Sequence, residues 1–448
     1  MEKKYEGIFK NLVKAYYNEN FDEVVATMLN EKDVDKERLS EIISTLCGVH
    51  VQHGENFIEN LKQGISSYKA NEKIVYKLTN STCSCNMDNE RTLCQEACPF
   101  NAILKNPITK TTYIDLDSCI DCGNCIEACN NHNLVDRSEF IPIMNLLKSK
   151  APVIVSVAPA IIGQFGNNVS MDQLRSAFKK VGFTDMVEVA FFADMLTIKE
   201  AVEFNHFVKS KDDLMITSCC CPMWVGMLKK VYEDLVTYVS PSVSPMIASG
   251  RVLKKLNPNC KVVFVGPCIA KKAEAKEKDL LGDIDYVLTF EEVKSIFEIL
   301  EIHPSSLEGV PSLEYASKGG RLYGRTGGVS IAVSDAIKEM FPEKYELLAT
   351  TQGSGVKECK ALLEDAKNHN INANFIEGMG CVGGCVGGPK ALIPKEEGKT
   401  SLNYFAEDSA YRVATHSDIM LSILKRIGIN SLEDFKDPKK VEIFERNF

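Results

Sequence analysis

The sequence predicts a three-part protein, with an α-helical amino-terminal segment, a small cysteine-rich α+β domain and a large α/β domain. Apolar residues recur at helical spacing through about the first 75 residues. Eight of the seventeen cysteines lie between Cys83 and Cys129, and short apolar runs alternate with helical stretches from about residue 150 onward. We therefore expect domains over residues 1–75, 76–147 and 148–448.

The composition is that of an ordinary globular protein and excludes several classes of function. Of the 448 residues, 45% are hydrophobic and 25% are charged, so extended disorder is not expected. The net charge of -9 argues against nucleic acid as a partner, because its phosphates call for a basic face. The amino terminus begins an amphipathic helix rather than a signal peptide, and the apolar stretch at 151–165 is too short to cross a bilayer. We expect a cytoplasmic protein with no membrane partner.

The amino-terminal segment is predicted to be helical and shows no chemistry of its own. Two groups of apolar residues fall on helix faces: Phe9, Leu12, Val13 and Tyr16, then Leu39, Ile42, Ile43 and Leu46. His50 and His53 are three residues apart on an expected helix, a spacing that would suit a metal ion. Two residues are a weak motif, so a partly exposed helix face without metal is the favoured interpretation. Cys47 is expected to be a small core residue.

The large domain shows the alternation of strand, turn and helix that is typical of α/β proteins. Short apolar runs predict buried strands at 153–155, 214–216, 262–265 and 374–376. Helical stretches at 171–181 and 290–300 lie between them, and the last forty or so residues are again mostly helical.

A compact run of four cysteines has the spacing C-x2-C-x2-C-x3-C: Cys119, Cys122, Cys125 and Cys129. In such a run, three thiolates wrap one corner of a 4Fe–4S cubane. A zinc site would instead call for two C-x2-C pairs set well apart. In a cytosolic protein disulfides are disfavoured, so dense and regularly spaced cysteines indicate metal. The run therefore predicts an iron–sulfur cluster.

A second, irregular run precedes it: Cys83, Cys85, Cys94 and Cys98. In two-cluster ferredoxins the fourth cysteine of a run binds the other cluster. This rule assigns one cluster to Cys83, Cys85, Cys94 and Cys129, and a second to Cys119, Cys122, Cys125 and Cys98. The segment resembles a bacterial two-cluster ferredoxin domain, which implies two 4Fe–4S clusters that conduct electrons. It departs from that pattern in its stretched beginning and in Asn130, where a proline is usual.

Three further cysteine-bearing turns each follow directly on an expected strand. They are TSCCCPMW at 217–224, GPCIAKKAE at 266–274 and EGMGCVGGC at 377–385. In α/β proteins, sites collect at the carboxyl ends of strands, so these turns are expected to converge. Four thiolates from the three turns would hold a further cubane, and the glycines around Cys381 and Cys385 would let the backbone approach it closely.

With these three turns, the sequence resembles an FeFe-hydrogenase over about residues 76–430. The family carries the signatures TSCCPxW, MPCxxKxxE and ExMACxxGCxxGG in this order. The resemblance implies an H-cluster, in which a 4Fe–4S cubane is linked to a two-iron unit bearing carbon monoxide, cyanide and an azadithiolate. Its cubane ligands would be Cys221, Cys268, Cys381 and Cys385, and Cys385 would bridge to the two-iron unit.

The resemblance also implies roles for residues around the two-iron unit. Lys271 would hydrogen-bond one cyanide, a charge-assisted contact, and Met379 would pack beside the irons. Pro159 and Ala160, at the start of the catalytic domain, and Ser244 match stretches that line the cluster.

A proton path follows from the same resemblance. Cys220 matches the thiol that passes protons to the bridging amine, and Ser240 matches the next hydroxyl. The implied reaction is the reversible interconversion of dihydrogen with protons and electrons. The implied partners are dihydrogen and protons, a small electron carrier such as a ferredoxin, and hydrogenase maturation factors.

Several positions depart from the family pattern. Cys219 is an additional cysteine in the first signature, and three residues replace usual ones: Ile162 an arginine, Met246 a glutamine and Gly266 a methionine. Glu200 and Glu203 lie near the family's proton-path glutamates but are shifted by one. These changes are expected to tune potentials and rates rather than the basic chemistry. Cys260 and Cys359 match no family position, and Trp224 is expected in the core.

Two other functions use similar residues. A dihydrogen sensor would carry the same cluster with little turnover, but no signalling domain is evident unless residues 1–75 serve as one, and Cys220 favours turnover. An iron–sulfur assembly protein would hold cubanes without the two-iron unit, and Lys271 argues against it, because a lysine aimed at cyanide needs the cyanide. A hydrogenase is the favoured interpretation.

Overall fold

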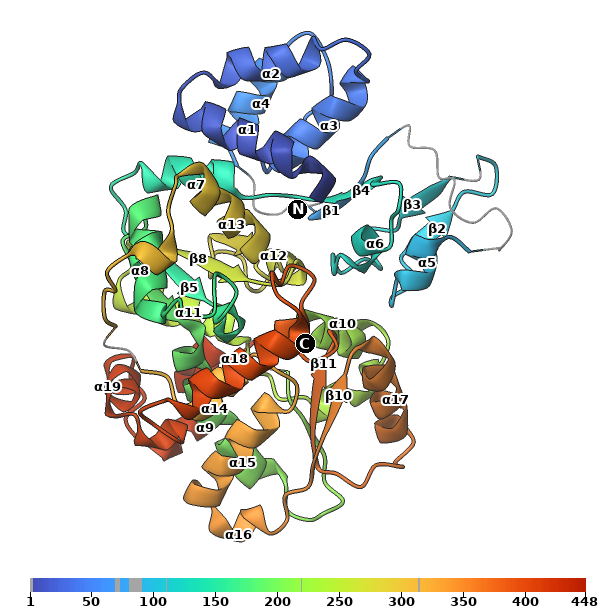
Figure 1. Ribbon diagram of the computed structural model, residues 1–448. Helices are drawn as coiled ribbons and strands as arrows, with labels where there is room; N and C mark the ends of the chain where they lie inside the picture. The colour runs from blue at the N-terminus through green and yellow to red at the C-terminus, as the bar shows by residue number, and fades with distance from the viewer. Residues whose placement is uncertain (1–2, 69–72, 80–90, 110, 219, 313–314) are drawn as a thin grey trace.

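The computed structural model describes residues 3–68, 73–79, 91–109, 111–218, 220–312 and 315–448. It shows a helical group at the amino terminus, a small region with short strands beside it, and a larger α/β body below both (Figure 1). Within these described residues, no helix is both long and apolar enough to span a membrane.

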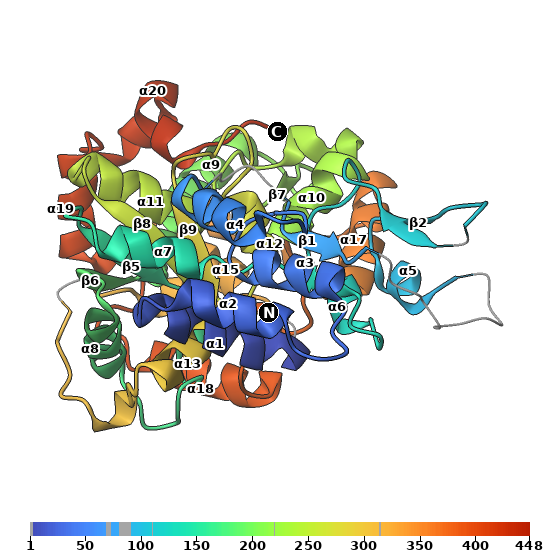
Figure 2. The same ribbon diagram turned by 90° about the horizontal axis from the view of Figure 1, so that it is seen from above.

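The amino-terminal segment forms a group of four helices, α1 (Glu6–Tyr17), α2 (Phe21–Leu29), α3 (Lys36–Leu46) and α4 (Phe57–Ser66). They bury the apolar faces that the sequence predicts, and Cys47 is fully buried among them. Helix α1 packs on α13 (Phe290–Ile299), and α1 and α4 pack on α7 (Phe140–Leu147) (Figures 1 and 2). The segment therefore shares its core with the α/β body.

The expected helix around His50 and His53 is absent. Helix α3 ends at Leu46, and Gly48 follows with a φ of +78°, a left-handed conformation that ends a helix. A Cβ at Gly48 would also lie 2.7 Å from the carbonyl oxygen of Ser138, so the chain turns away there in irregular structure. The ring of His50 stacks on Tyr76, with centroids 5.4 Å apart.

The cysteine-rich region contains two short antiparallel pairs. Strand β1 (Val75–Lys77) pairs with β4 (Leu134–Asp136), and β2 (Ile103–Lys105) pairs with β3 (Thr112–Ile114). The short helices α5 (Leu93–Ala97) and α6 (Asn124–Glu127) connect them and contact each other. Cys83 and Cys85 lie outside the described residues.

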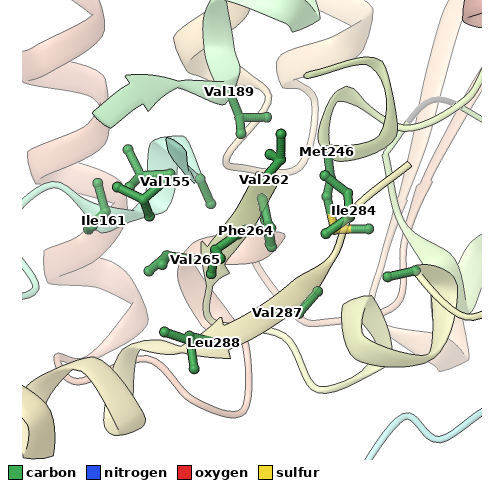
Figure 3. Packing of buried hydrophobic residues seen from close by; sticks show 14 of the residues in the cluster. Val155, Ile161, Val189, Met246, Val262, Phe264, Val265, Ile284, Val287 and Leu288 are labelled. Atoms are coloured by element: carbon green, nitrogen blue, oxygen red, sulfur yellow. The ribbon is translucent and has the colours of Figure 1, made fainter. Parts of the chain in front are cut away.

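The α/β body contains a four-stranded parallel sheet in the order β6-β5-β8-β9. Its strands are β5 (Val153–Val157), β6 (Asp185–Glu188), β8 (Lys261–Gly266) and β9 (Tyr286–Thr289). Buried aliphatic side chains cover it, as expected for a parallel sheet with helices on its faces. Figure 3 shows part of this core, with labels on Val155, Ile161, Val189, Met246, Val262, Phe264, Val265, Ile284, Val287 and Leu288.

A second, three-stranded parallel sheet has the order β10-β11-β7. Its strands are β7 (Met215–Ile216), β10 (Thr350–Ser354) and β11 (Phe375–Met379). The four apolar runs read as strands in the sequence are therefore β5, β7, β8 and β11, divided between the two sheets.

Helices surround both sheets and complete the body. Those before residue 300 are α13, described above, and α8 (Met171–Val181), α9 (Val189–Phe207), α10 (Pro222–Lys230), α11 (Pro245–Leu256) and α12 (Ala270–Glu274). Those after it are α14 (Lys318–Leu322), α15 (Gly328–Met340), α16 (Pro342–Tyr345), α17 (Val356–Lys367), α18 (Lys395–Glu407), α19 (Asp418–Arg426) and α20 (Pro438–Val441). Helix α9 is buried along most of its length, because α11, α14 and α15 all pack against it.

A buried ion pair between Glu139 and Lys276 joins the cysteine-rich region to the body, and Tyr68 ties the amino-terminal segment to it. Glu139 pairs with Lys276, accepts a hydrogen bond from Tyr68 Oη at 2.7 Å and another from the Val287 amide at 2.8 Å. Burial alone would raise the pKa of the Glu139 carboxyl, but Lys276 and further cations outweigh it and lower this pKa to about 2.

We expect Glu139→Gln to lower the free energy of unfolding by about 3–5 kcal/mol at pH 7, because it leaves Lys276 as a buried, unpaired charge. Because the pKa of Glu139 is depressed in the folded protein, the stabilisation by its carboxylate is complete above pH 4.5, the ordinary pKa of a glutamate. It should shrink as the pH falls toward 2. Urea unfolding at pH 7, 4 and 3 measures it. The half-exposed Glu298, which pairs with Lys10, offers a control, and Glu298→Gln should cost less than about 1 kcal/mol.

Candidate iron–sulfur site

Four thiols from three turns converge where the two sheets meet. Cys221 precedes α10 and follows β7, whereas Cys381 and Cys385 follow β11 in the same three-stranded sheet. Cys268 follows β8 of the four-stranded sheet. The carboxyl ends of parallel strands thus bring together cysteines that lie far apart in the sequence.

Electrostatic coupling shows that these four thiols are neighbours. Burial, followed by the thiols of Cys268, Cys221 and Cys385, raises the pKa of Cys381 well above its ordinary value. Burial, Cys221 and Cys385 likewise raise the pKa of Cys268 to about 12. Within the described part of the chain, no three His, Cys, Asp or Glu side chains are close enough to share a single metal ion.

The turn that carries Cys381 and Cys385 holds its shape through glycines. A Cβ at Gly384, whose φ is +88°, would lie 2.5 Å from the backbone nitrogen of Thr326. A Cβ at Gly380 would meet Met223 at 2.6 Å, and the Gly380 amide donates to Cys221 Sγ at 3.3 Å. An amide aimed at a sulfur suits a thiolate ligand, so this donor set fits an iron–sulfur cluster.

A buried lysine faces the thiols. Lys271 in α12 is 7% exposed, and its Nζ lies 2.6 Å from Glu274 Oε2. Burial disfavours its charge, but Glu274, Cys220 and Cys268 outweigh this and raise the pKa of Lys271. The site therefore combines four thiols with a fixed cation, a combination that fits a cluster with anionic ligands.

Cys220 lies beside the thiol set without being one of the four. It forms a hydrogen bond with Cys385, the largest of the effects that lower the pKa of Cys385. Its Sγ also lies 3.7 Å from the carbonyl oxygen of Tyr323. The structure thus places Cys220 next to the cysteine that the sequence assigns as the bridge to the two-iron unit.

Two buried hydroxyl–carboxylate pairs accompany this thiol in the body, one of them at Thr217 in the same turn. Ser240 Oγ donates to Glu203 Oε2 at 2.7 Å, and it is 2.8 Å from Ser242 Oγ. Thr217 Oγ1 donates to Glu200 at 2.8 Å. The one-residue shift noted in the sequence therefore does not separate Glu203 from Ser240.

The other residues assigned by resemblance lie at the ends of elements in the α/β body. Met379 ends β11 and is 1% exposed, and Pro159 and Ala160 lie in a 3-10 turn directly after β5. Ser244 caps α11, where its Oγ accepts a hydrogen bond from the Ile247 amide at 3.4 Å. Its hydroxyl is therefore engaged in building the helix.

The structure places the four cysteines assigned to the second cluster near one another. Cys98, Cys119, Cys122 and Cys125 influence one another electrostatically, and Cys94 acts on Cys125. These are the four cysteines assigned to the second cluster by the rule that the fourth cysteine of a run binds the other cluster, and Cys94 lies beside them.

This group also adjoins the four thiols, because a Cβ at Gly123, next to Cys122, would lie 2.5 Å from the side chain of Ile269, the residue after Cys268. Cys129 Sγ accepts from the Asn133 amide at 3.3 Å and packs in the same apolar cluster as Cys94.

The cysteines without a family position take separate places, and Trp224 is in the core as expected. Cys359 is fully buried, and its Sγ is 3.4 Å from the carbonyl oxygen of Met379. Cys260 is 3% exposed and lies just before β8 begins. Trp224 is 1% exposed, and its Nε1 donates to the Thr217 carbonyl at 2.7 Å. Cys219 lies outside the described residues.

Sequence reasoning missed the contribution of the carboxyl-terminal segment. Glu445 Oε1 lies 3.5 Å from Lys199 Nζ, and Arg446 Nη1 lies 3.6 Å from Glu274 Oε1. Nothing in the local pattern around these residues signals such contacts, because they depend on a strand-like pairing with a distant loop.

Comparison with known proteins agrees with this geometry. The family model described as "Iron only hydrogenase large subunit, C-terminal domain" matches residues 151–389. Iron hydrogenase 1 from Clostridium pasteurianum is 29% identical over 401 residues, which span 69% of this chain and 70% of that protein. Cytosolic iron-sulfur assembly component 3 from Mus musculus is 25% identical over 356 residues, spanning 64% of this chain and 74% of the relative.

The fold is also shared with solved structures. A variant of the apo FeFe-hydrogenase HydA1 from Chlamydomonas reinhardtii matches with a TM-score of 0.57 at 22% identity, and the match covers 68% of this chain and 98% of that one. Such a match shows a common α/β fold. Because the family model covers more than half of the sequence, this chain belongs to the iron-only, or FeFe, hydrogenase family.

Proposed function

We propose that the protein is an FeFe-hydrogenase that interconverts dihydrogen with protons and electrons. The observation that carries this proposal is the position of Cys220, a thiol outside the four-cysteine set that is hydrogen-bonded to Cys385 and faces the ammonium of Lys271. A site that only held a cubane would need neither group.

The four converging cysteines would hold the cubane of an H-cluster: Cys221, Cys268, Cys381 and Cys385. When bound, the cluster would supply the metal position at which dihydrogen is bound and cleaved. Lys271 would hydrogen-bond a cyanide ligand, and Met379, Pro159, Ala160 and Ser244 would shape the space around the two-iron unit.

The chain's own groups would move the proton. Cys220 Sγ would accept and release it next to the cluster, and Ser240 Oγ and the Glu203 carboxylate would carry it through the buried interior. Proton transfer by positioned side chains typically contributes about 10²- to 10⁴-fold to rate.

Residues 76–147 would form a ferredoxin-like domain with two 4Fe–4S clusters, one of them held by Cys119, Cys122, Cys125 and Cys98. The proximity of Cys122 to Cys381 supports its use as an electron conductor to the catalytic domain. A small carrier such as a ferredoxin would exchange electrons with it, and maturation factors would insert the two-iron unit. Residues 1–75 would be the helical amino-terminal segment, which packs on the body, and 148–448 the catalytic domain.

The direct test is to load the purified protein with a complete H-cluster and to confirm loading by its carbonyl and cyanide infrared bands. Dihydrogen evolution is then measured with a reduced dye as the electron donor. Sustained evolution supports the hydrogenase. A loaded protein that is nearly inert, but whose bands shift under dihydrogen, would be a sensor.

Failure to take up the two-iron unit would contradict the proposal and favour a role in iron–sulfur assembly. Relatives named for that role are among the similar proteins, so this outcome has a defined interpretation. Iron content and cubane spectra of the same sample show whether the cubanes themselves are in place.

A further inference from the structure

A buried lysine occupies the outer end of the Ser240–Glu203 pair. Lys199 Nζ lies 2.5 Å from Glu203 Oε1, while Ser240 Oγ donates to the other carboxylate oxygen. The Lys199 side chain is only 1% exposed and that of Glu203 10%. Because a buried ammonium is costly unless it is paired, its presence here calls for a reason.

The same ammonium reaches a carboxylate on the carboxyl-terminal segment. Lys199 Nζ lies 3.5 Å from Glu445 Oε1, and the Glu445 side chain is 30% exposed to solvent. The segment is held in place by backbone pairing, because Ser242 and Glu445 form an antiparallel bridge and the Arg446 amide donates to the Pro241 carbonyl at 2.8 Å. Glu445 is thus fixed between the buried lysine and water.

The contacts form a continuous polar chain. Lys199 Nζ also donates to Ser242 Oγ at 3.3 Å, which is 2.8 Å from Ser240 Oγ. The chain runs from Ser240 through Glu203 and Lys199 to Glu445, and of these four only Glu445 is substantially exposed.

We propose that Lys199 and Glu445 form the outer end of the proton path, so that protons exchange with solvent at Glu445. This inference rests on the proposed hydrogenase function. In the outward direction, the Lys199 ammonium gives one proton to the Glu445 carboxylate and takes one from protonated Glu203. Glu445 then releases a proton to water, and the net charge of Lys199 is restored. Lys199 relays protons between the two carboxylates in this scheme and lies outside the four-thiol set.

The first test does not depend on turnover. In Lys199→Met, Glu203 loses its closest cation in a buried setting, so its carboxyl should take up a proton. A carboxylic-acid C=O absorption should then appear in the infrared spectrum near neutral pH. It should be missing from the double variant Lys199→Met/Glu203→Gln. If no such band appears, Lys199 does not sustain the charge of Glu203 and the proposal is wrong.

The second test measures dihydrogen evolution by the loaded protein. We expect Lys199→Met to reduce it about a hundredfold, the lower end of what a positioned proton carrier contributes. Glu445→Gln should reduce it about tenfold, and a higher concentration of a small buffer should restore part of the rate, because the buffer can then take protons at the opening. Glu442→Gln, on an exposed residue of the same segment, is the matched control and should leave the rate unchanged.

Wild-type rates in Lys199→Met and Glu445→Gln would overturn the proposal and leave the hydrogenase assignment intact. If the wild type itself does not turn over, the hydrogenase assignment fails, and the infrared test still decides whether Lys199 and Glu203 are coupled. Thermal unfolding of each variant separates these results from a simple loss of fold.

Discussion

Replacing Cys220 with alanine should lower dihydrogen evolution by about 10²- to 10⁴-fold without reducing the iron content of the protein. The thiol is hydrogen-bonded to Cys385 but is not one of the four converging cysteines, so its loss should remove a proton carrier and spare the cluster. The measurement is evolution from a reduced dye, with iron analysis and infrared bands on the same sample.

A buried cysteine away from the four thiols supplies the control for this experiment. Cys260 is 3% exposed and lies before β8, at the opposite end of that strand from Cys268. Cys260→Ala should keep full activity. Equal rates in Cys220→Ala and the wild type would show that protons leave the site by another route.

Replacing Lys271 with methionine should prevent stable uptake of the two-iron unit and bring dihydrogen evolution below detection. The side chain is 7% exposed and faces the thiols, so methionine would remove the fixed cation while keeping similar bulk. Glu274 would also lose its partner at 2.6 Å, although Arg446 remains 3.6 Å from it. The carbonyl and cyanide bands should be absent, whereas the cubane spectra should persist.

Lys254 provides the matched control, because it forms an ion pair with Asp285 at 2.6 Å in a partly buried position on α11. Lys254→Met should take up the two-iron unit normally. If Lys271→Met also loads normally and turns over, the buried ammonium serves the fold rather than the cluster.

Much of the α/β body could be predicted because its signals are local. The strands β5, β7, β8 and β11 each contain a short apolar run, and the cysteine turns follow three of them directly. The carboxyl-end rule for α/β sheets then predicts convergence without any knowledge of the packing. What it does not predict is that the turns come from two different sheets.

The remaining features depend on contacts that no local pattern encodes. The pair Lys199–Glu445 requires the carboxyl-terminal segment to pair with the loop at Ser242, and neither partner has a periodic signal. The helix expected at His50 fails because Gly48 adopts a left-handed conformation against Ser138, a tertiary contact. Cys83 and Cys85, assigned to the first cluster, lie outside the described residues and stay a prediction.

The division of the thiols between two sheets makes a bound cubane a mechanical cross-link. Three of the converging cysteines follow strands of the three-stranded sheet, and Cys268 alone follows the four-stranded one. A cluster held by all four would staple the two sheets together. The empty polypeptide should therefore open along this seam more readily than the filled one. The empty protein would admit a cofactor more readily and resist proteolysis less well. Binding of the cluster would reverse both properties.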